Sequence, residues 1–266
     1  MLELHSSHAH ADTPFTLQVG QRDLLEGHTP RQNRLLAALP TQDYARLLPN
    51  LVPVPLPPGS TLYGAGDPER YLYFLTAGIV SRFQIMQSGV ATEFALTGRE
   101  GVVGIATFLC GGSIPSQAVV VSAGYAYRLR ADIVRREFEH GFPLAHLLLR
   151  YTQALIVETG QTAVCIRHHS LQQQLCRWIL SCLDRSPSSE VTMTQELIAN
   201  MLGVRRESVT EAASALQKAG LIHYSRGHIT VPDRPRLEAQ ACECYAVVKR
   251  EYDRLLPEHR QAEVAF

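Results

Sequence analysis

The spacing of apolar residues along the chain separates a strand-rich region from helical ones. Between residues 51 and 130, short apolar runs alternate with turn signals such as Pro57-Pro58-Gly59 and Gly64-Ala65-Gly66. The runs are rich in β-branched and aromatic residues, which favour strands, and strands at this spacing are typical of a β-barrel or sandwich. We expect strands over 71–75, 79–85, 91–96 and 118–121.

Helical spacing occurs on both sides of this region. It predicts an amphipathic helix over 31–48 that Pro40 interrupts, a short helix over 131–140, a long one over 141–167 and another over 170–183. Certain positions of the long helix recur at steps of four and three residues, which is the seam of a coiled coil. The second half of the seam is polar, so a helix packed into the protein's own core remains an alternative. The seam residues are Leu144, Leu148, Tyr151, Leu155, Glu158, Thr162 and Cys165.

Residues 194–217 predict two short helices joined by a tight turn. Thr194 can cap the first helix, and Gly203 lies where the chain must turn, because glycine tolerates a positive φ. Both helices carry an apolar stripe at helical spacing. The inward-facing residues are Leu197, Ile198, Met201 and Leu202 in the first helix, and Val209, Ala212, Ala213 and Leu216 in the second.

The outer face of the second helix carries side chains that suit DNA. A helix that presents Arg, Glu and Thr from its N-terminal end can enter a major groove and read base edges. Two strands around Ser225-Arg226-Gly227 would follow as a β-wing. An ordinary helical hairpin packed beside a β-hairpin would share this spacing. The candidate DNA-binding residues are Arg205, Arg206, Glu207, Thr210, Glu211, Ser214 and Arg226.

The net charge of the chain gives no support to DNA binding. The chain has 266 residues and a formal net charge of zero, so no overall basic field attracts a polyanion. Residues 170–236 hold eight Lys/Arg against six Asp/Glu. DNA binding would therefore depend on the local placement of Arg205, Arg206, Lys218 and Arg226.

Other classes of protein are disfavoured by what the sequence lacks. No apolar run is long enough to span a membrane, the N-terminus has no signal-peptide pattern, and the six cysteines lack the spacing of a secreted disulfide scaffold. We expect a cytoplasmic protein. A metal-dependent enzyme built on the barrel is disfavoured because no histidine occurs between His28 and His140.

The order of barrel, long helix and winged helix-turn-helix resembles the Crp/Fnr family of bacterial transcription regulators. The resemblance is most specific at Gly203-Val-Arg-Arg-Glu-Ser-Val209, which looks like the start of that family's recognition helix. It implies an α+β fold with an N-terminal double-stranded β-helix (a β-roll or jelly roll), a long dimerisation helix and a C-terminal winged helix-turn-helix. We expect a disordered tail over 1–28, a cyclic-nucleotide-binding-like effector domain over 29–140, the dimerisation helix over 141–169, the DNA-binding domain over 170–236 and a helical extension over 237–266.

The resemblance also assigns roles to residues and partners. Arg206 matches the family arginine that pairs with guanine, and Glu207 matches the neighbour that accepts from cytosine. Glu211 stands where familiar members carry a second base-reading arginine, so the outer half-site should differ from their consensus. The family implies a homodimer on a near-palindromic double-stranded site, in contact with RNA polymerase. The dimer residues would be Leu144, Leu148, Tyr151, Leu155 and Thr162.

The effector domain departs from the family's cyclic-nucleotide members. Those members hold the ribose with a glutamate and the cyclic phosphate with an arginine, but the matching stretches here read Gly104-Ile105-Ala106 and Pro115-Ser116. We expect a degenerate pocket, an unknown effector and no cofactor. A cyclic-nucleotide-responsive regulator or signalling module with a non-standard pocket, and a regulator without any effector, remain alternatives.

The cysteines and histidines give no metal assignment. Cys242 and Cys244 could hold an ion with His223 or His228. Cys165, Cys176 and Cys182 could form a thiol switch, but a role as buried small hydrophobic residues on helices explains them better.

Overall fold

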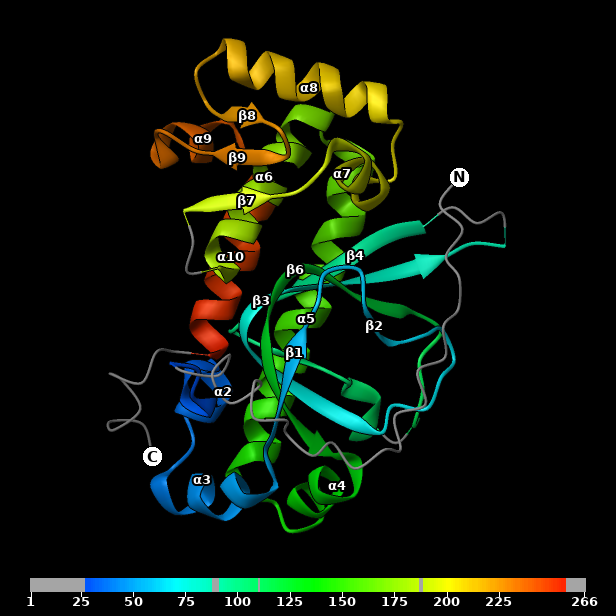
Figure 1. Cartoon of the computed structure of the whole chain (residues 1–266), viewed down its shortest axis with the longest axis vertical. Coiled ribbons are helices and arrows are strands. Elements are labelled where there is room, and N and C mark those ends of the chain that lie inside the picture. Colours follow the sequence, from blue (N-terminus) through cyan, green and yellow to red (C-terminus); the bar gives the residue numbers. More distant parts are fainter. Residues whose placement is uncertain (1–26, 88–90, 110, 187–188, 257–266) are drawn as a thin grey trace.

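The computed structural model describes residues 27–256, apart from 88–90, 110 and 187–188. A β-sheet domain occupies one half and a winged helical domain the other, and the long helix α5 runs through both (Figure 1). The tail with His5, His8 and His10 lies almost wholly outside the described residues. None of the described helices is both long and apolar enough to cross a membrane.

Short helical segments precede the β-sheet domain. The expected helix over 31–48 is divided at Pro40, because proline removes a backbone donor and restricts the residue before it. Asn33 caps the first α-helix, and its buried amide also donates to the carbonyls of Leu75 and Gly101, which fixes this segment to the domain. The segments are η1 (Pro30–Gln32), α2 (Arg34–Ala37), α3 (Thr41–Leu47) and η2 (Leu48–Asn50).

The β-sheet domain is an antiparallel roll with two long central strands. The path β1-β6-β3-β4 is completed by β2, which pairs with β6, and β5, which pairs with β3. Strand β1 contains Pro53 and Pro55, which an edge strand tolerates. The fold confirms the expected β-roll. Its strands are β1 (Val52–Leu56), β2 (Thr61–Tyr63), β3 (Tyr71–Ile85), β4 (Ala91–Thr97), β5 (Val102–Val103) and β6 (Gln117–Arg130).

Strands β3 and β6 bend where two glycines meet. We expected a turn at 76–78 to separate two strands, but β3 continues through it with bulges. Gly78 has φ +83°, and a Cβ on Gly124 would lie 2.0 Å from the Ala77 carbonyl oxygen. Glycine therefore permits the close approach that lets the roll close without interrupting its strands.

Helices α4 (Ala131–Glu139), α5 (Pro143–His168) and α6 (Leu171–Arg185) connect the roll to the winged domain. Pro143 begins α5 in the position where its missing N–H costs nothing. Ser170 then opens α6 with a capping box that involves Gln173. The junction between α5 and α6 is thus only two residues long, His169 and Ser170.

The winged domain confirms the predicted helix-turn-helix and β-wing. Its small sheet has the strand order β7-β9-β8. Arg226 and Gly227 form the wing turn, with φ values of 50° and 85°, as a tight hairpin requires. The elements are β7 (Glu190–Thr192), α7 (Gln195–Leu202), α8 (Arg206–Lys218), β8 (His223–Ser225) and β9 (His228–Thr230).

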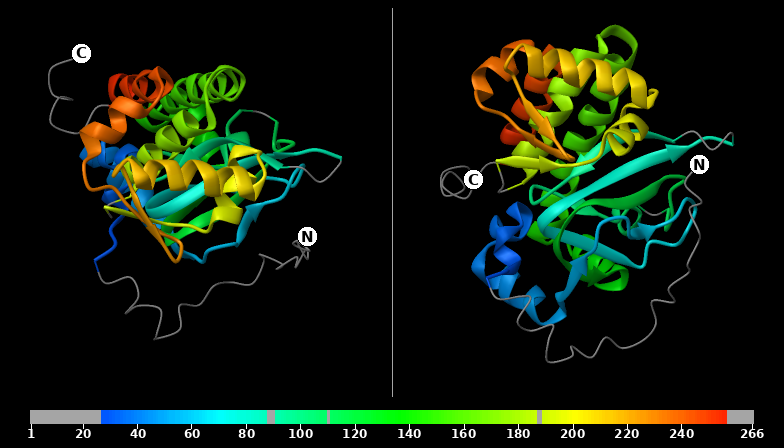
Figure 2. Two further views of the ribbon diagram at one scale, coloured as in Figure 1. Left: turned by 90° about the horizontal axis from the view of Figure 1, so that it is seen from above. Right: turned by 45° about the horizontal axis from the view of Figure 1, so that its top comes forward.

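Two further helices follow the wing and return toward the roll. Helix α9 (Arg234–Gln240) packs on α6, and α10 (Glu243–Leu255) packs along α5. The view from above shows α10, in red, beside the green helices (Figure 2, left). The C-terminal segment is therefore part of the body of the protein.

Three large apolar clusters form most of the core of the described residues. One fills the roll, and a second joins the N-terminal helices, α5 and α10. The third is shared between domains, since Phe83 and Leu96 of the roll pack with Ile179 and Met201 of the winged half. The winged domain is thus docked on the hairpin of β3 and β4.

Candidate functional site

Helices α7 and α8 form the helix-turn-helix through three local features. The Thr194 hydroxyl accepts from the Leu197 amide at 3.2 Å and caps α7. Gly203 ends α7 with φ 65°, a left-handed conformation that favours glycine. Arg205 then precedes α8 as its N-cap residue. These features direct the N-terminal end of α8 outward.

The two faces of α8 divide as the sequence predicted. Val209, Ala212, Ala213 and Leu216 are buried in the shared core. Helix α8 lies along the outer surface, away from the roll (Figure 2, right). All seven candidate DNA-binding residues are exposed: Arg205, Arg206, Glu207, Thr210, Glu211, Ser214 and Arg226.

These exposed side chains differ in how firmly they are held. The Thr210 hydroxyl donates to Gln195 Oε1 at 2.8 Å and so links α8 to α7. Within the described part of the chain, no ion pair or side-chain hydrogen bond engages Arg205, Arg206 or Arg226. Their guanidinium groups are therefore free for an external acceptor.

A hollow of about 260 Å³ separates the start of α8 from the wing. Arg206 lines it on the helix side, and Tyr224 and Arg226 line it on the wing side. The Tyr224 hydroxyl donates to the Met193 carbonyl at 2.8 Å, which fixes the ring. Two cations at one shallow surface suit a polyanion such as the phosphate backbone.

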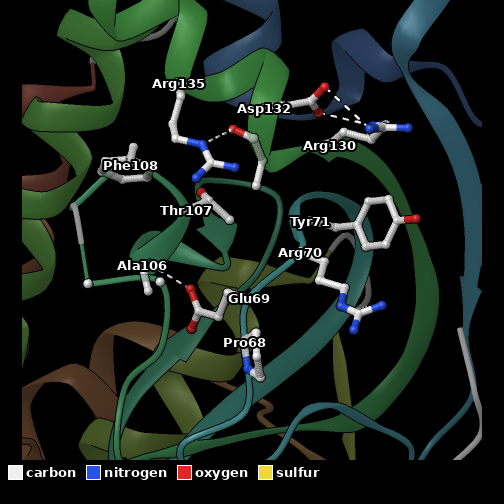
Figure 3. Close-up of a pocket in the computed structure, with 13 residues that line it drawn as sticks. Pro68, Glu69, Arg70, Tyr71, Ala106, Thr107, Phe108, Arg130, Asp132 and Arg135 are labelled. Atoms are coloured by element: carbon white, nitrogen blue, oxygen red, sulfur yellow. Dashed lines mark hydrogen bonds and ion pairs between the residues drawn. The ribbon is translucent and has the colours of Figure 1, made fainter.

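In the β-roll, the carboxylate of Glu69 accepts from a backbone amide at a turn where an anion could otherwise bind. Gly104, with φ 108°, precedes the short helix η3 (Ile105–Thr107). The Glu69 carboxylate is buried and accepts from the Ala106 amide at 2.6 Å (Figure 3). Burial raises the pKa of Glu69, although this hydrogen bond opposes the shift. The Ala106 amide of this turn thus already has a hydrogen-bond acceptor within the protein.

A cavity of about 570 Å³ opens beside this turn. Arg70, Arg130 and Arg135 lie around it (Figure 3). The Arg130 guanidinium pairs with Asp132 at 3.0 Å, and Arg135 Nε donates to the Ala131 carbonyl. The cavity wall is therefore basic, but its arginines already serve local contacts.

A cation that sequence reasoning missed lies inside the roll. Arg82 on β3 is fully buried, and its Nη2 donates to the Val102 carbonyl and to the Tyr151 hydroxyl at 3.3 Å. Its Nε and Nη1 atoms have no hydrogen-bond partner within the described residues. Tyr151 belongs to α5, so this arginine connects the roll to the long helix. Its position within an apolar strand gave no signal in the sequence.

The long helix requires a correction to the expected dimer residues. Leu144, Leu148, Tyr151 and Leu155 are buried within the protomer, against the roll and α10, so they cannot face a second chain. Thr162 is half-buried and accepts from Arg177 at 2.7 Å. The alternative of a core helix describes this side of α5 correctly, since a stripe with heptad spacing can pack inside a protomer as well as between two.

Cysteines and a histidine from distant segments meet at the end of α5. The ligand atoms of Cys165, His169, Cys242 and Cys244 all lie within 4.8 Å of one another. The expected alternative ligands belong to the wing, where His228 instead pairs with Glu190. Sequence spacing could not reveal this group, because its two halves are 73 or more residues apart.

Two family models match the chain. Residues 53–140 match the cyclic nucleotide-binding domain, and residues 173–240 match the Crp-like helix-turn-helix domain. These matches coincide with the β-roll and the winged domain.

Known relatives agree with both matches. A global nitrogen regulator of Synechococcus elongatus is 24% identical over 182 residues, 65% of this chain and 82% of its own. A CRP-like cAMP-activated global transcriptional regulator of Mycobacterium tuberculosis is 24% identical over 204 residues, 74% of this chain and 91% of its own. FixK2 of Bradyrhizobium japonicum has the same fold, with a TM-score of 0.64 and 17% identity over 72% of this chain and 98% of its own. The chain therefore belongs to the Crp/Fnr family of transcription regulators, with a cyclic nucleotide-binding-type domain and a helix-turn-helix DNA-binding domain.

Proposed function

We propose that this regulator binds a near-palindromic site on double-stranded DNA as a homodimer, with α8 of each protomer in the major groove. The observation that carries the proposal is the free, exposed set of arginines at the start of α8 and in the wing. Arg206 reads guanine, Glu207 accepts from cytosine, and Arg226 binds phosphate. Glu211 disfavours purine edges nearby and shifts the outer half-site away from the familiar consensus.

The face of α5 that would hold the second protomer is its exposed side. Leu149 and Ile156 are 50% and 67% exposed although both are apolar. With neighbouring exposed residues they follow steps of three and four, the spacing of a two-stranded coiled coil. Gly160 has open space where a Cβ would lie, so a second helix can approach closely. The proposed seam consists of His146, Leu149, Gln153, Ile156, Gly160, Ala163 and Arg167.

A second copy of the same chain is the partner that fits this seam. Because the seam lies on one helix of the protomer, a two-fold axis would bring identical residues together. Such symmetry would present the two α8 helices to inverted half-sites, expected one DNA turn apart, which accounts for a near-palindromic target.

The effector domain supports regulation by something other than cyclic AMP bound in the familiar way. Glu69 holds the amide of the η3 turn, and a phosphate there would meet its carboxylate. The contact from Arg82 to Tyr151 offers a route by which a change in the roll could alter α5. A cyclic nucleotide in a non-standard pocket remains the second candidate, since Arg82 is a buried cation with free donors.

The family resemblance extends the proposal to a regulator without enzymatic activity that works in the cytoplasm and contacts RNA polymerase. Selection of binding sites from random duplex DNA by the purified, ligand-free protein tests the central claim, sequence-specific binding by a dimer. Enrichment of an inverted repeat is expected. If no sequence is enriched with or without cell extract, the winged domain does not read DNA in this way.

A further inference from the structure

Four potential metal ligands converge where α5 meets α10. Cys165 lies in the last turn of α5, and His169 follows as its C-cap residue. Cys242 is the N-cap residue of α10, and Cys244 lies in its first turn. The three thiols are buried together in a cluster of their own, separate from the large apolar cores. The side chains therefore meet because the C-terminal extension returns to the long helix.

Two of the distances within this group are close to those around one tetrahedral ion, and no two ligand atoms are more than 4.8 Å apart. Cys165 Sγ lies 3.5 Å from Cys242 Sγ, and Cys244 Sγ lies 3.4 Å from His169 Nδ1. Zinc–sulfur and zinc–nitrogen bonds of about 2.3 and 2.0–2.1 Å place tetrahedral ligand atoms about 3.5–3.8 Å apart. An iron–sulfur cluster distributes its thiolates over several iron atoms and needs wider spacing. The geometry therefore selects a mononuclear centre.

The donor set identifies the class of ion. Three thiolates and one imidazole are a common ligand set of structural zinc sites, which are closed and four-coordinate. Cys165 and Cys244 are 0% exposed and Cys242 is 4% exposed, so water has little access to a fifth position. A catalytic zinc site would instead keep a position open.

Neighbouring side chains orient the ligands. His169 Nε2 lies 3.3 Å from Glu243 Oε2, so the carboxylate can hold the proton on that nitrogen and leave Nδ1 for the ion. Gln161 Nε2 donates to Cys244 Sγ at 3.1 Å. Arg177 on α6 donates to the Thr162 hydroxyl at 2.7 Å, about one turn before Cys165. Its positive charge would partly offset the net negative charge of three thiolates around a divalent cation.

We propose that Cys165, His169, Cys242 and Cys244 bind one structural zinc ion in each protomer. The ion would fasten the C-terminal extension to the junction between α5 and α6. His169 is one of the two residues of that junction, so the same ion would fix the point from which the DNA-binding domain leaves the long helix.

The first test is the metal content of the untagged, full-length protein, measured by plasma mass spectrometry after purification without chelators. About one zinc per protomer is expected for the native protein. The expected result for Cys242→Ala, Cys244→Ala and His169→Gln is zinc at background level. The matched controls are His168→Gln, an exposed neighbouring imidazole, and Cys176→Ala, a buried thiol outside the group; both should keep the ion.

A second measurement does not depend on the folding of variants. Addition of Co²⁺ to the metal-free native protein should produce thiolate-to-cobalt charge transfer and the visible bands of tetrahedral coordination, and Zn²⁺ should remove both. Iron with acid-labile sulfide, a Cys165–Cys242 disulfide in the protein as purified, or a spectrum without these bands would overturn the proposal. Neither test uses DNA, so failure here is distinguishable from failure of the proposed function.

Discussion

Some exposed side chains of α8 are hydrogen-bonded within the protein and others are not. The prediction for DNA recognition concerns those without an internal partner. The Thr210 hydroxyl is held by Gln195, whereas the Arg206 guanidinium has no hydrogen-bond or ion-pair partner within the described chain. A guanidinium that is already held must break its contacts before it can read a base. The Arg206 guanidinium breaks no internal contact when it binds, so the free energy of the arginine–guanine pair is not reduced by such a loss.

Replacement of Arg206 by alanine should lower affinity and relax base choice at one position of each half-site. The expected loss of discrimination is about 1–3 kcal/mol, the value of a bidentate arginine–guanine pair. Fluorescence anisotropy with the selected site and its single-base variants measures it. Arg226→Ala is the control, because loss of a phosphate contact should weaken all sequences alike. Unchanged base preference in Arg206→Ala would show that another residue reads this position.

Glu93 is a buried carboxyl at the contact between the roll and α6. Burial raises its pKa from 4.5 to about 8, although hydrogen bonds from Ser81 and Trp178 oppose the shift. The folded state therefore favours the protonated form. The raised pKa of Glu93 therefore stabilises the folded protein. This contribution to the free energy of unfolding is fully present below the pKa of the unfolded state, near 4.5, and is lost as the pH rises through about 8.

Replacement of Glu93 by glutamine should remove this pH dependence. In the native protein, the contribution of Glu93 to the free energy of unfolding should fall by about 1 kcal/mol per pH unit between about pH 6 and 8. Urea unfolding at several pH values measures the slope. Glu139→Gln on the exposed side of α4 should keep the native slope. Equal slopes in Glu93→Gln and the native protein would mean that the carboxyl is ionised when folded.

At the scale of elements, helix α5 shows where sequence patterns stop being informative. Its length and position were predictable, and the turn at Gly203 placed the helix-turn-helix correctly. The helix has apolar residues on two sides, however, and periodicity alone does not say which side faces the protomer's own core. The side of α5 that faces the core is the one covered by α10 and the roll. Because α10 lies far along the chain, local periodicity in α5 cannot reveal this. The same return creates the group around Cys165 and His169, which no local pattern contains.

Adjacent residues of α5 provide a direct test of the proposed seam. Ile156→Asp should leave the protomer folded and separate the dimer, because Ile156 is 67% exposed. Sedimentation equilibrium should then give half the native mass. Leu155→Asp should instead prevent stable folding, since Leu155 is 4% exposed and a carboxylate there would be buried without a partner. If Ile156→Asp kept the native mass, the partner would have to bind elsewhere.

At the scale of the whole molecule, one buried charge network joins four parts of the chain. Arg185 of α6 pairs with Glu158 of α5 at 2.8 Å and with Glu100 of the roll at 3.0 Å. The Tyr252 hydroxyl of α10 donates to Glu158 at 2.7 Å. Each member is almost fully buried, so water cannot compensate the charges, and Glu158 accepts hydrogen bonds from both Arg185 and Tyr252.

Removal of single members should therefore destabilise the protein well beyond the effect of a surface ion pair. Tyr252→Phe should cost about 1–3 kcal/mol, because it leaves a buried carboxylate oxygen without its donor. Glu158→Gln should cost about 3–5 kcal/mol, because it breaks a buried pair. Differential scanning calorimetry measures both as a lower Tm. Lys249→Gln, which removes an exposed pair with Asp253 on α10, is the control and should change stability by less than about 1 kcal/mol. A Tyr252→Phe variant as stable as this control would contradict the network's role.

The packing of α10 against α5 also limits how the winged domain can move. A domain joined to its neighbour only at the start of α6 could swing in any direction. Here the chain leaves the long helix through α6 and comes back to it through α10, so the domain is attached at both of its ends. Once its apolar contact with the β3–β4 hairpin is released, a body held at these two points keeps one easy motion, rotation about the line between them. The separation of the two recognition helices in a dimer would then follow a single angle, and a signal in the roll would need to change only that angle.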